Sequence, residues 1–524
     1  MSDETYSVDF SGSVHPTSHP LVALCTITLP ADTEVTVEFG LTTQYGRSTS
    51  PVPAPPGGGP VSFLVAGMMA ARTYQMRARI RLPDGKHVTT PGALFQTGPL
   101  PNIALPTLSA TTFANQAPSP GVELVNVIDP TGISVVSDID GNILWYYDNS
   151  ADSSWKGYAF PIKPLPNGNM LASITNLYSA GVPQPIPYDS VLREIDFVGN
   201  PVRELYLVDL NAVLKAMGSD VQALCYSHDV LRLPNGHTIL LVQQQKTVQL
   251  TLPPGPGQFT ILGDAMVDLD ENFNPVWTWS AFDHLDVDRH PYEFDAANGY
   301  DWTHCNCIQL APDGNLILSS RSQNWVMKID YEGGNGDGTI LWRLGYQGDF
   351  TLVGSQTADT DWFFAQHFPN LLPSPPGHPE RSERSLAFRL AVMDNGNDRC
   401  YAMPGGCAAT NPAPPPPFTR AAIFKIDETA MTAQLAWQYP LNEYSYWGGN
   451  VMSLINGDIE ICASEPIPIG APIPPSDVPS QVVELSSGPS RPVIVWQMTV
   501  KPGGTYRSYR IPSLYPGVIW SDGA

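Results

Sequence analysis

Residues 301–314 read DWTHCNCIQLAPDG and place a histidine, two cysteines and an asparagine side by side. Such a run could form a metal site, a redox pair, or neither. If the run is a β-strand, its two-residue side-chain period puts His304 and Asn306 on one face and Cys305 and Cys307 on the other. The two thiols would then lie too far apart for an easy disulfide. We therefore expect two polar side chains directed into a site, and two cysteines that act as small buried hydrophobic residues.

Similar side chains recur at equivalent places along the chain. The residue six positions before a turn proline is Phe160 in FPIKPLPNGN, His228 in HDVLRLPNGH, Asn306 in NCIQLAPDGN and His367 in HFPNLLPSPP. Equivalent positions of repeated strands around one axis converge on one point, which predicts a single site built from several repeats.

Hairpin counting adds an arginine to this site. If Ala311 pairs with Leu316 across the turn PDGN, Asn306 lies opposite Arg321 of SSRSQN. The same count across PNGH sets His228 opposite Gln243.

The candidate site therefore combines imidazoles, an amide and a guanidinium, and has no carboxylate at these positions. Donors of this kind suit a small tetrahedral oxyanion such as sulfate or phosphate. A glycosidase would need two carboxylates instead. The candidate residues are His228, His304, Asn306, Arg321 and His367.

The composition indicates which elements must position these residues. The 524 residues include 53 prolines and 44 glycines, and no long segment has the 3.6-residue period of an amphipathic helix. We therefore expect an all-β protein of many short strands. A net charge of -23 with only 27 lysines and arginines argues against nucleic acid as a partner. No run of eighteen apolar residues occurs, so no membrane-spanning segment is expected.

The chain divides into a non-repeating and a repeating part. Residues 1–97 alternate apolar and polar side chains and resemble a fibronectin type III β-sandwich, in which the hydroxyl of Tyr74 ties down the preceding loop. Residues 98–120 are a Pro-rich linker. Residues 121–524 repeat a unit of roughly 60 to 80 residues.

The repeating part predicts a six-bladed β-propeller. Each unit opens with an apolar strand and a Gly turn, and most units close with a strand that carries a tryptophan. The C-terminal segment TYRSYRIPSLYP is expected to complete the first blade. The tryptophans of the closing strands are Trp145, Trp277, Trp342, Trp437 and Trp496.

Four motifs, SHDV, DWTHCN, SSRSQN and FAQHFPN, occur in the order found in the bacterial aryl-sulfate sulfotransferases, and the chain resembles that family. The resemblance implies a β-sandwich followed by a six-bladed propeller. It also implies ping-pong transfer of a sulfuryl group from an aryl sulfate donor to a phenolic acceptor, with no nucleotide donor, cofactor or metal. By motif, His367 would become transiently sulfated, and His228, His304, Asn306 and Arg321 would hold the sulfuryl and bridging oxygens.

Several points stay open at this level. Either His304 or His228 could protonate the leaving oxygen. Cys400 and Cys407 could form a loop disulfide or remain free thiols. The family is usually exported to the periplasm or secreted, yet the start MSDETYSVDFSG shows no leader, so a cytoplasmic location stays open. A homodimer is one alternative for the oligomeric state.

Three other functions compete with the sulfotransferase. His228, His304 and His367 could hold iron in an oxygenase, as in carotenoid-cleaving propellers, although Arg321 would repel the metal. A non-catalytic propeller could bind peptide or glycan. A phosphoryl or phenol-ester hydrolase could use the same anion-binding residues.

Overall fold

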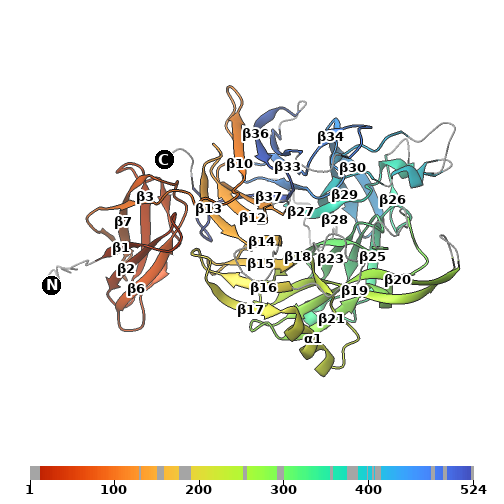
Figure 1. Cartoon of the computed structure of the whole chain (residues 1–524), viewed down its shortest axis with the longest axis horizontal. Helices are drawn as coiled ribbons and strands as arrows, with labels where there is room; N and C mark the ends of the chain where they lie inside the picture. Colours follow the sequence, from red (N-terminus) through yellow and green to blue (C-terminus); the bar gives the residue numbers. More distant parts are fainter. Residues whose placement is uncertain are drawn as a thin grey trace.

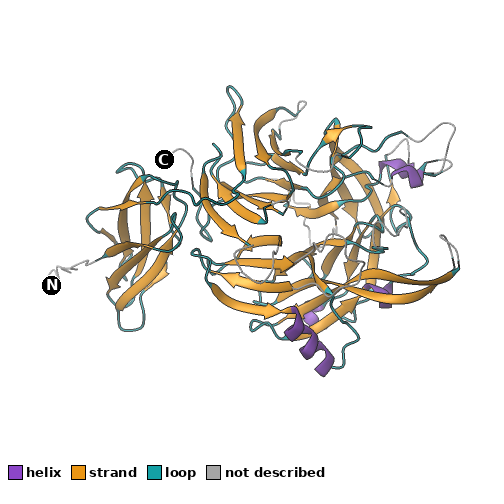
Figure 2. Ribbon diagram, viewed as in Figure 1, coloured by secondary structure: helices purple, strands orange, loops and turns teal. Residues whose placement is uncertain are grey.

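The computed structural model describes almost the whole chain as β-structure joined by turns (Figure 2). The described residues are 12–128, 131–149, 158–175, 190–251, 256–291, 300–354, 358–373, 387–397, 399–403, 406–407, 415–473, 478–487 and 492–520. Its helices are short: α1 (Leu207–Ala216), α2 (Ala281–His284), η1 (Glu332–Gly334), η2 (Ala358–Asp361) and η3 (Arg399–Ala402). No helix among the described residues is long and apolar enough to span a membrane.

The N-terminal strands form two sheets in a separate lobe (Figure 1). One sheet has the order β1 (Ser13–Pro16), β2 (Ala23–Leu29), β6 (Gly59–Val65). The other contains β4 (Arg47–Ser48), β3 (Glu34–Gly40), β7 (Thr73–Arg81) and β8 (His87–Thr89), with β5 (Val52–Pro53) on β3 and β9 (Ala93–Gln96) on β7. The Tyr74 hydroxyl accepts a hydrogen bond from the Met69 N–H at 2.8 Å, which is the predicted tie to the preceding loop.

The remaining strands of the described chain form six sheets of four or five strands, and one short pair of β31 (Glu443–Tyr444) and β34 (Ile467–Pro468). Three of the six sheets come from the first half of the repeating part, except that the C-terminal strand β37 belongs to the first of them. The first is β13 (Ile143–Asp148), β12 (Ile133–Ser137), β11 (Val122–Val127), β37 (Thr505–Ile511); the second is β14 (Tyr158–Pro164), β15 (Met170–Thr175), β16 (Ser190–Ile195), β17 (Pro201–Tyr206); the third is β18 (Cys225–Arg232), β19 (Thr238–Leu250), β20 (Gly257–Leu269), β21 (Pro275–Ser280).

The other three sheets come mainly from the second half. The fourth is β22 (Cys305–Leu310), β23 (Leu316–Ser320), β24 (Trp325–Ile329), β25 (Ile340–Gly345); the fifth is β26 (Thr351–Leu352), β30 (Thr432–Pro440), β29 (Arg420–Asp427), β28 (Ala387–Asp394), β27 (His367–Leu372); the sixth is β10 (Thr107–Thr112), β36 (Ile494–Lys501), β35 (Ser480–Leu485), β33 (Ile459–Ala463), β32 (Asn450–Ser453). Strand β10 lies within the segment predicted to be a linker.

The repeated Gly turns have one geometry. In PNGN, PNGH and PDGN the glycines Gly168, Gly236 and Gly314 adopt φ values near +90°, and each glycine N–H donates to the carbonyl three residues earlier. Positive φ carries no steric penalty for glycine, so the turn closes a tight hairpin between the first two strands of each sheet. The first strand of each of these sheets is therefore fixed relative to its neighbour.

Successive sheets meet along these first strands. Strand β11 contacts β14, and the contacts continue from β14 to β18, β22, β27 and β32. Strand β32 in turn contacts β37, the C-terminal strand paired with β11. This pairing confirms the prediction that TYRSYRIPSLYP completes the first sheet.

The predicted tryptophans lie on the last or the next-to-last strand of their sheets, and four of them link neighbouring sheets. The Nε1–H groups of Trp145, Trp277, Trp342 and Trp496 donate to atoms of the next sheet or of its loops. The acceptors are the carbonyls of Phe197, Gly336 and Ile139 and the carboxylate of Glu428.

Candidate functional site

Each of four first strands is irregular at the position that carries a candidate residue. The strand pairing shifts between Ala159 and Ile162 in β14, between Tyr226 and Val230 in β18, between Cys305 and Cys307 in β22, and between His367 and Asn370 in β27. A bulge leaves the extra residue unpaired and redirects its side chain. Phe160, His228 and Asn306 lie inside these bulges, and His367 borders the fourth bulge and pairs with Met393.

The bulges overturn the predicted register. Leu310, not Ala311, pairs with Leu316, and Asn306 lies in the bulge without a ladder partner. Arg321 donates its backbone N–H to the carbonyl of His304, so His304 is the residue it faces. Gln243 likewise pairs with Cys225 rather than His228. The prediction was wrong by one residue at each turn, because Leu310 and Arg232 are the residues that pair with Leu316 and Thr238, and it was wrong again by the residues that the bulges insert.

Strand alternation was also the wrong reason for separating His304 from the cysteines. His304 precedes β22 and has a φ of +45°. Cys305 and Cys307 are nevertheless fully buried free thiols, as predicted. Burial raises the pKa of the Cys307 thiol to about 12, so it does not ionise at neutral pH.

The three predicted histidines come together. The ring centroids of His228 and His304 are 4.6 Å apart, and those of His304 and His367 are 6.4 Å apart. His367 is 2 % exposed, whereas the His304 side chain is 23 % exposed. The cluster therefore has His367 as its buried member and His304 as a more accessible one.

His367 is held at both ring nitrogens. Its Nδ1 lies 2.8 Å from Oδ1 of Asn395, and the Gly448 N–H donates to its Nε2 at 3.3 Å. Burial, followed by the charge of Arg321, holds the pKa of His367 well below its usual range. His367 is therefore neutral at neutral pH.

The other two histidines have polar partners of different charge. Nδ1 of His304 lies 2.6 Å from the Asp301 carboxylate. Nδ1 of His228 lies 2.8 Å from the Ser227 hydroxyl, which contacts Asp264 at 3.3 Å. Burial and then His304 hold the pKa of His228 well below its usual range.

Asp264 is a second carboxyl group behind the cluster. It accepts hydrogen bonds from the Thr303 hydroxyl at 2.6 Å and the Cys305 N–H at 2.7 Å. Burial, followed by the charge of Asp301, raises the pKa of Asp264 to about 6. The carboxyl groups of Asp301 and Asp264 thus lie behind the predicted donors, although the predicted set itself contained no carboxylate.

Arg321 and Asn306 contribute in different ways. Arg321 is partly exposed, its guanidinium lies 3.5 Å from the Tyr446 carbonyl, and its charge lowers the pKa of both His228 and His367. Asn306 is fully buried, and its Nδ2 donates to the Gln366 carbonyl at 2.8 Å, next to His367. One of its two amide hydrogens is therefore used to join β22 to β27.

An aromatic surface borders the cluster. The rings of Phe160 and Tyr506 lie 5.5 Å and 5.9 Å from that of His228, and Tyr506 lies 6.3 Å from His367. They pack with Ile128 and, at its edge, with Tyr158 and Trp447. We call Ile128, Tyr158, Phe160, Trp447 and Tyr506 the aromatic wall. Phe160 and Tyr506 are buried, so the aromatic wall is a packed side of the histidine cluster, and only its edge at Tyr158 and Trp447 is partly buried.

Below the wall, Arg507 is fully buried and paired. Its guanidinium lies 3.3 Å from Asp229, whose other cationic partner, Lys163, lies at 2.6 Å. Burial alone would raise the pKa of Asp229, but Lys163 and Arg507 outweigh it and lower that pKa. Arg507 is thus a fixed positive charge close to His228 and His367.

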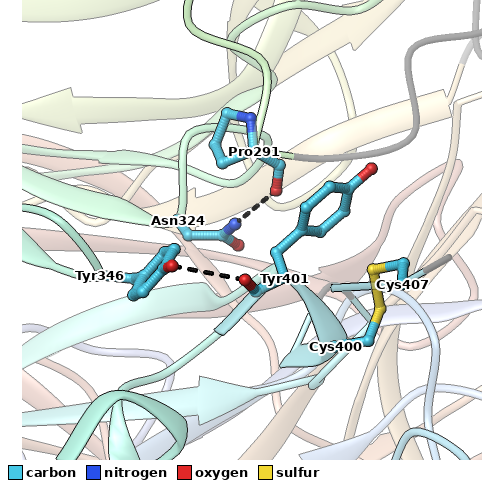
Figure 3. The surroundings of a disulfide bond; sticks show 6 residues. All are labelled: Pro291, Asn324, Tyr346, Cys400, Tyr401 and Cys407. Carbon is cyan, nitrogen blue, oxygen red and sulfur yellow. Dashed lines mark hydrogen bonds between the residues drawn. A yellow bond between two sulfur atoms is a disulfide. The ribbon is translucent and has the colours of Figure 1, made fainter. Parts of the chain in front are cut away.

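Cys400 and Cys407 form a disulfide, so the first of the two alternatives left open is the observed one. Figure 3 shows its surroundings, where the Tyr346 hydroxyl donates to the Tyr401 carbonyl at 3.3 Å. Arg399, the residue before Cys400, forms a 2.6 Å ion pair with buried Asp394, which is the neighbour of Asn395. The disulfide loop is therefore tied to the segment that contacts His367.

The sequence of this region matches a known family. Residues 110–470 match the family model described as Arylsulfotransferase (ASST). The chain belongs to the arylsulfotransferase family. Because the match covers more than half of the chain and includes every candidate residue, family membership supports aryl sulfotransferase activity in general, with aryl sulfates and phenols as substrates.

Other comparisons of this arylsulfotransferase family member are distant. A search of curated proteins found no match. A protein of unknown function from Bacteroides caccae is 12 % identical, with a TM-score of 0.37, over 75 % of this chain and 100 % of that chain. An auxiliary nutrient binding protein from Bacteroides thetaiotaomicron is 10 % identical, with a TM-score of 0.32, over 86 % of this chain and 94 % of that chain. Likeness at this level carries no functional argument.

Sequence reasoning missed several residues of the candidate site. Asp301 stands three residues before His304 within DWTH, and Ser227 precedes His228 within SHDV, so both were visible in the motifs. Asn395 and Tyr506 lie outside the aligned repeat positions and had no such signal. No group of three or more His, Cys, Asp or Glu in the described part of the chain is arranged to hold a metal ion.

Proposed function

We propose that this protein transfers a sulfuryl group from an aryl sulfate to a phenol by a ping-pong mechanism, with His367 as the nucleophile and without a nucleotide donor. The observation that carries the proposal is the state of His367. A buried imidazole whose pKa is held well below its usual range keeps Nε2 unprotonated at neutral pH, and donors and an aromatic wall lie beside it. The long hydrogen bond that Nε2 accepts from the Gly448 N–H at 3.3 Å is exchanged for sulfur when the lone pair attacks.

In the first half-reaction, Nε2 of His367 attacks sulfur in line with the bond to the phenolic oxygen. The N–S bond forms, the S–O bond breaks, and its electron pair leaves on the phenolate. Sulfuryl transfer resembles phosphoryl transfer in having little bonding at the transition state, so orientation and charge stabilisation supply most of the rate. Arg321, the imidazoles of His228 and His304, and the free amide hydrogen of Asn306 are the groups proposed to hold the oxygens.

His304 is the better of the two candidates for the general acid. Asp301 at 2.6 Å from Nδ1 directs the other ring nitrogen, Nε2, towards the cluster and stabilises a positive ring by charge. His228 instead faces a neutral hydroxyl and is surrounded by cationic groups that lower its pKa. In the second half-reaction His304 takes the proton of the acceptor phenol, whose oxygen attacks the sulfo-histidine and regenerates neutral His367.

The aromatic wall supports an aryl substrate. Phe160 lies 5.5 Å from the His228 ring and Tyr506 lies 6.3 Å from the His367 ring, and both side chains are buried. A phenyl group is proposed to pack at the partly buried edge of the wall, beside Tyr158 and Trp447, with its phenolic oxygen facing the imidazoles. Donor and acceptor phenols are proposed to use the wall in turn, as a ping-pong reaction requires.

The architecture proposed for this function is a six-bladed β-propeller after a fibronectin type III-like sandwich. Its support is the chain of contacts from β11 to β32 and back to β37, and the tryptophan links between neighbouring sheets. A disulfide at Cys400 and Cys407 favours an oxidising compartment, so we also propose that the protein works in the periplasm or outside the cell.

The test uses 4-nitrophenyl sulfate as donor. Purified protein should release about one equivalent of nitrophenolate rapidly without an acceptor, and should turn over continuously when phenol is added. His367→Ala should abolish both phases. His237→Ala is the matched control, because His237 pairs with Asp268 on a hairpin turn outside the cluster and should leave both phases intact.

Two results would sink the proposal. Continuous release that ignores added phenol would indicate a hydrolase. Release that survives His367→Ala would show that another group is the nucleophile.

A further inference from the structure

Asn395 is the residue behind the proposed nucleophile. It follows strand β28 directly and is fully buried. Its side-chain oxygen lies 2.8 Å from Nδ1 of His367, and its Nδ2 donates to the carbonyls of Ser445 at 2.7 Å and Gly448 at 3.2 Å. Every polar atom of this side chain is thus engaged.

The two backbone carbonyls fix which way the amide faces. If the amide were rotated by 180°, Oδ1 would face two carbonyl oxygens, and no hydrogen would lie between them. Nδ2 must therefore face Ser445 and Gly448, and Oδ1 must face His367. An oxygen acceptor at that place requires a donor, so the neutral imidazole carries its hydrogen on Nδ1.

The other side of the ring agrees. The Gly448 N–H points at Nε2 of His367 from 3.3 Å, and an N–H can only meet a lone pair there. Both contacts select the same tautomer, in which Nδ1 carries the hydrogen and Nε2 is unprotonated.

We infer that Asn395 is a positioning residue that holds the Nδ1 hydrogen of His367 and thereby makes Nε2 the nitrogen that is sulfated. The inference rests on the proposed function for its chemical consequence, whereas the tautomer is a property of the free protein. Asn395 touches neither sulfur nor substrate and acts through the imidazole alone.

A neutral acceptor suits both half-reactions. When the Nε2 lone pair forms the N–S bond, Nδ1 keeps its hydrogen, so the ring becomes positively charged. In the second step the N–S bond breaks and its electrons return to Nε2, so the positive ring is a good leaving group. An amide oxygen stabilises that ring without neutralising it, whereas a carboxylate would stabilise the protonated free histidine too and remove the nucleophile.

The first measurement reads the tautomer without substrate. Protein with ¹⁵N-labelled histidine should show a protonated Nδ1 and an unprotonated Nε2 for His367 at neutral pH, assigned by its loss in His367→Ala. Asn395→Ala should mix the two tautomers. Asn397→Ala is the matched control, because Asn397 lies two residues on and donates to the same loop at the Tyr446 carbonyl, yet does not contact a histidine.

The second measurement is the pH dependence of sulfuryl transfer. Asn395→Ala should lower the rate roughly 10- to 100-fold. Asn395→Asp keeps an oxygen acceptor and should move the acidic limb of the pH–rate profile up by about 1 to 3 pH units. The charged and titratable groups that face His367 are Arg321, His304, His228, Arg507 and Tyr506, and all of them are unchanged in these variants.

The outcomes separate this inference from the proposed function. A hydrogen on Nε2 in the wild-type protein overturns the inference, and so does Asn395→Asp with an unmoved acidic limb. If Asn395→Ala does not fold, Asn395→Asp and the wild-type tautomer still decide. A protonated Nδ1 in a protein that transfers no sulfuryl group would refute the proposed function and leave the positional assignment standing.

Discussion

Three identical side chains in this site differ through the atom that faces Nδ1. His367 has an amide oxygen, His304 a carboxylate and His228 a hydroxyl. The partner of one ring nitrogen decides what the other can do, because it fixes the tautomer and the stability of the positive ring. The proposed division into a nucleophile, a general acid and a group that holds the sulfuryl oxygens therefore follows from residues that are not themselves proposed to contact the substrate.

The acid assignment predicts a dependence on the leaving group. Asp301→Asn removes the charge that supports a positive His304, so transfer from phenyl sulfate, whose phenolate is a poor leaving group, should slow by about 10²- to 10⁴-fold. Transfer from 4-nitrophenyl sulfate should slow much less, because nitrophenolate leaves without a proton. Steady-state rates with both donors at saturating phenol test this.

The comparison within one variant is its own control for folding. A misfolded protein would lose both donors equally. Equal losses with correctly folded Asp301→Asn protein, judged by far-UV circular dichroism, would contradict the acid role of His304.

At the scale of elements, four bulges bring the site together. The sequence predicted the first strands, their Gly turns and the tryptophan strands, because these rest on local patterns that each repeat carries. It predicted the wrong register around Asn306 and His228, because one or two residues inserted into a strand leave no compositional mark. Asn395 was missed for a related reason, since it occupies a connection and no repeated position.

The connection that carries the Gly448 N–H predicts a steric limit. Gly448 has a φ of +61°, and a Cβ added there would lie 2.4 Å from Oγ and 3.1 Å from Cβ of Ser464. Gly448→Ala should therefore move the loop, remove the contact that orients the His367 ring, and lower the rate of transfer by roughly 10-fold or more. In addition, a left-handed conformation costs a non-glycine residue about 1 to 2 kcal/mol.

Gly314→Ala separates these two effects. Gly314 has a φ of +88°, and no atom lies within 4 Å of a Cβ added there, so alanine at this position meets only the backbone penalty. Chemical denaturation and transfer rates of both variants are the measurement. If Gly448→Ala lost stability alone, or if both variants lost the same activity, the loop would not be positioning the nucleophile.

At the scale of the whole molecule, the two ends of the repeating part are joined twice. Strand β37 completes the first sheet and strand β10 extends the last, so each end of the chain is built into the other's neighbourhood (Figure 1). The C-terminal segment then reaches the N-terminal lobe, where Trp520 packs edge-on against Phe39 and donates to the Ser48 carbonyl at 2.9 Å. Separating the ends would therefore disturb both lobes.

A cluster of buried charges lies at this junction. Arg510 of β37 contacts Glu123 of β11, Glu460 of β33 and Glu484 of β35. One cation cannot balance three carboxylates, and burial followed by the charge of Glu123 raises the pKa of Glu460 well above its usual range. Glu460 therefore keeps its proton in the folded protein at pH values where the unfolded chain would lose it.

This proton predicts how stability depends on pH. The unfolded glutamate has a pKa of about 4.3, so above that pH the folded state binds one more proton than the unfolded state. The contribution of Glu460 to stability should be greatest below that value and should fall by about 1.4 kcal/mol per pH unit until its folded pKa is passed. Glu460→Gln keeps a neutral donor in place and should remove this part of the slope, while the slopes set by the other groups with shifted pKa values stay.

Glu194→Gln is the opposing control. Burial alone would raise the pKa of Glu194, but Asn169, Asn167 and Arg203 outweigh it and lower that pKa, so its stabilisation is lost as the pH falls rather than as it rises. The test is urea denaturation of the wild type and both variants between about pH 4.5 and pH 9. This range begins just above the pKa of an unfolded glutamate, so the raised pKa of Glu460 contributes to the slope within it. Glu194→Gln should keep the wild-type slope over that range. If Glu460→Gln also kept the wild-type slope, Glu460 would not hold the extra proton in the folded protein, and the prediction would be wrong.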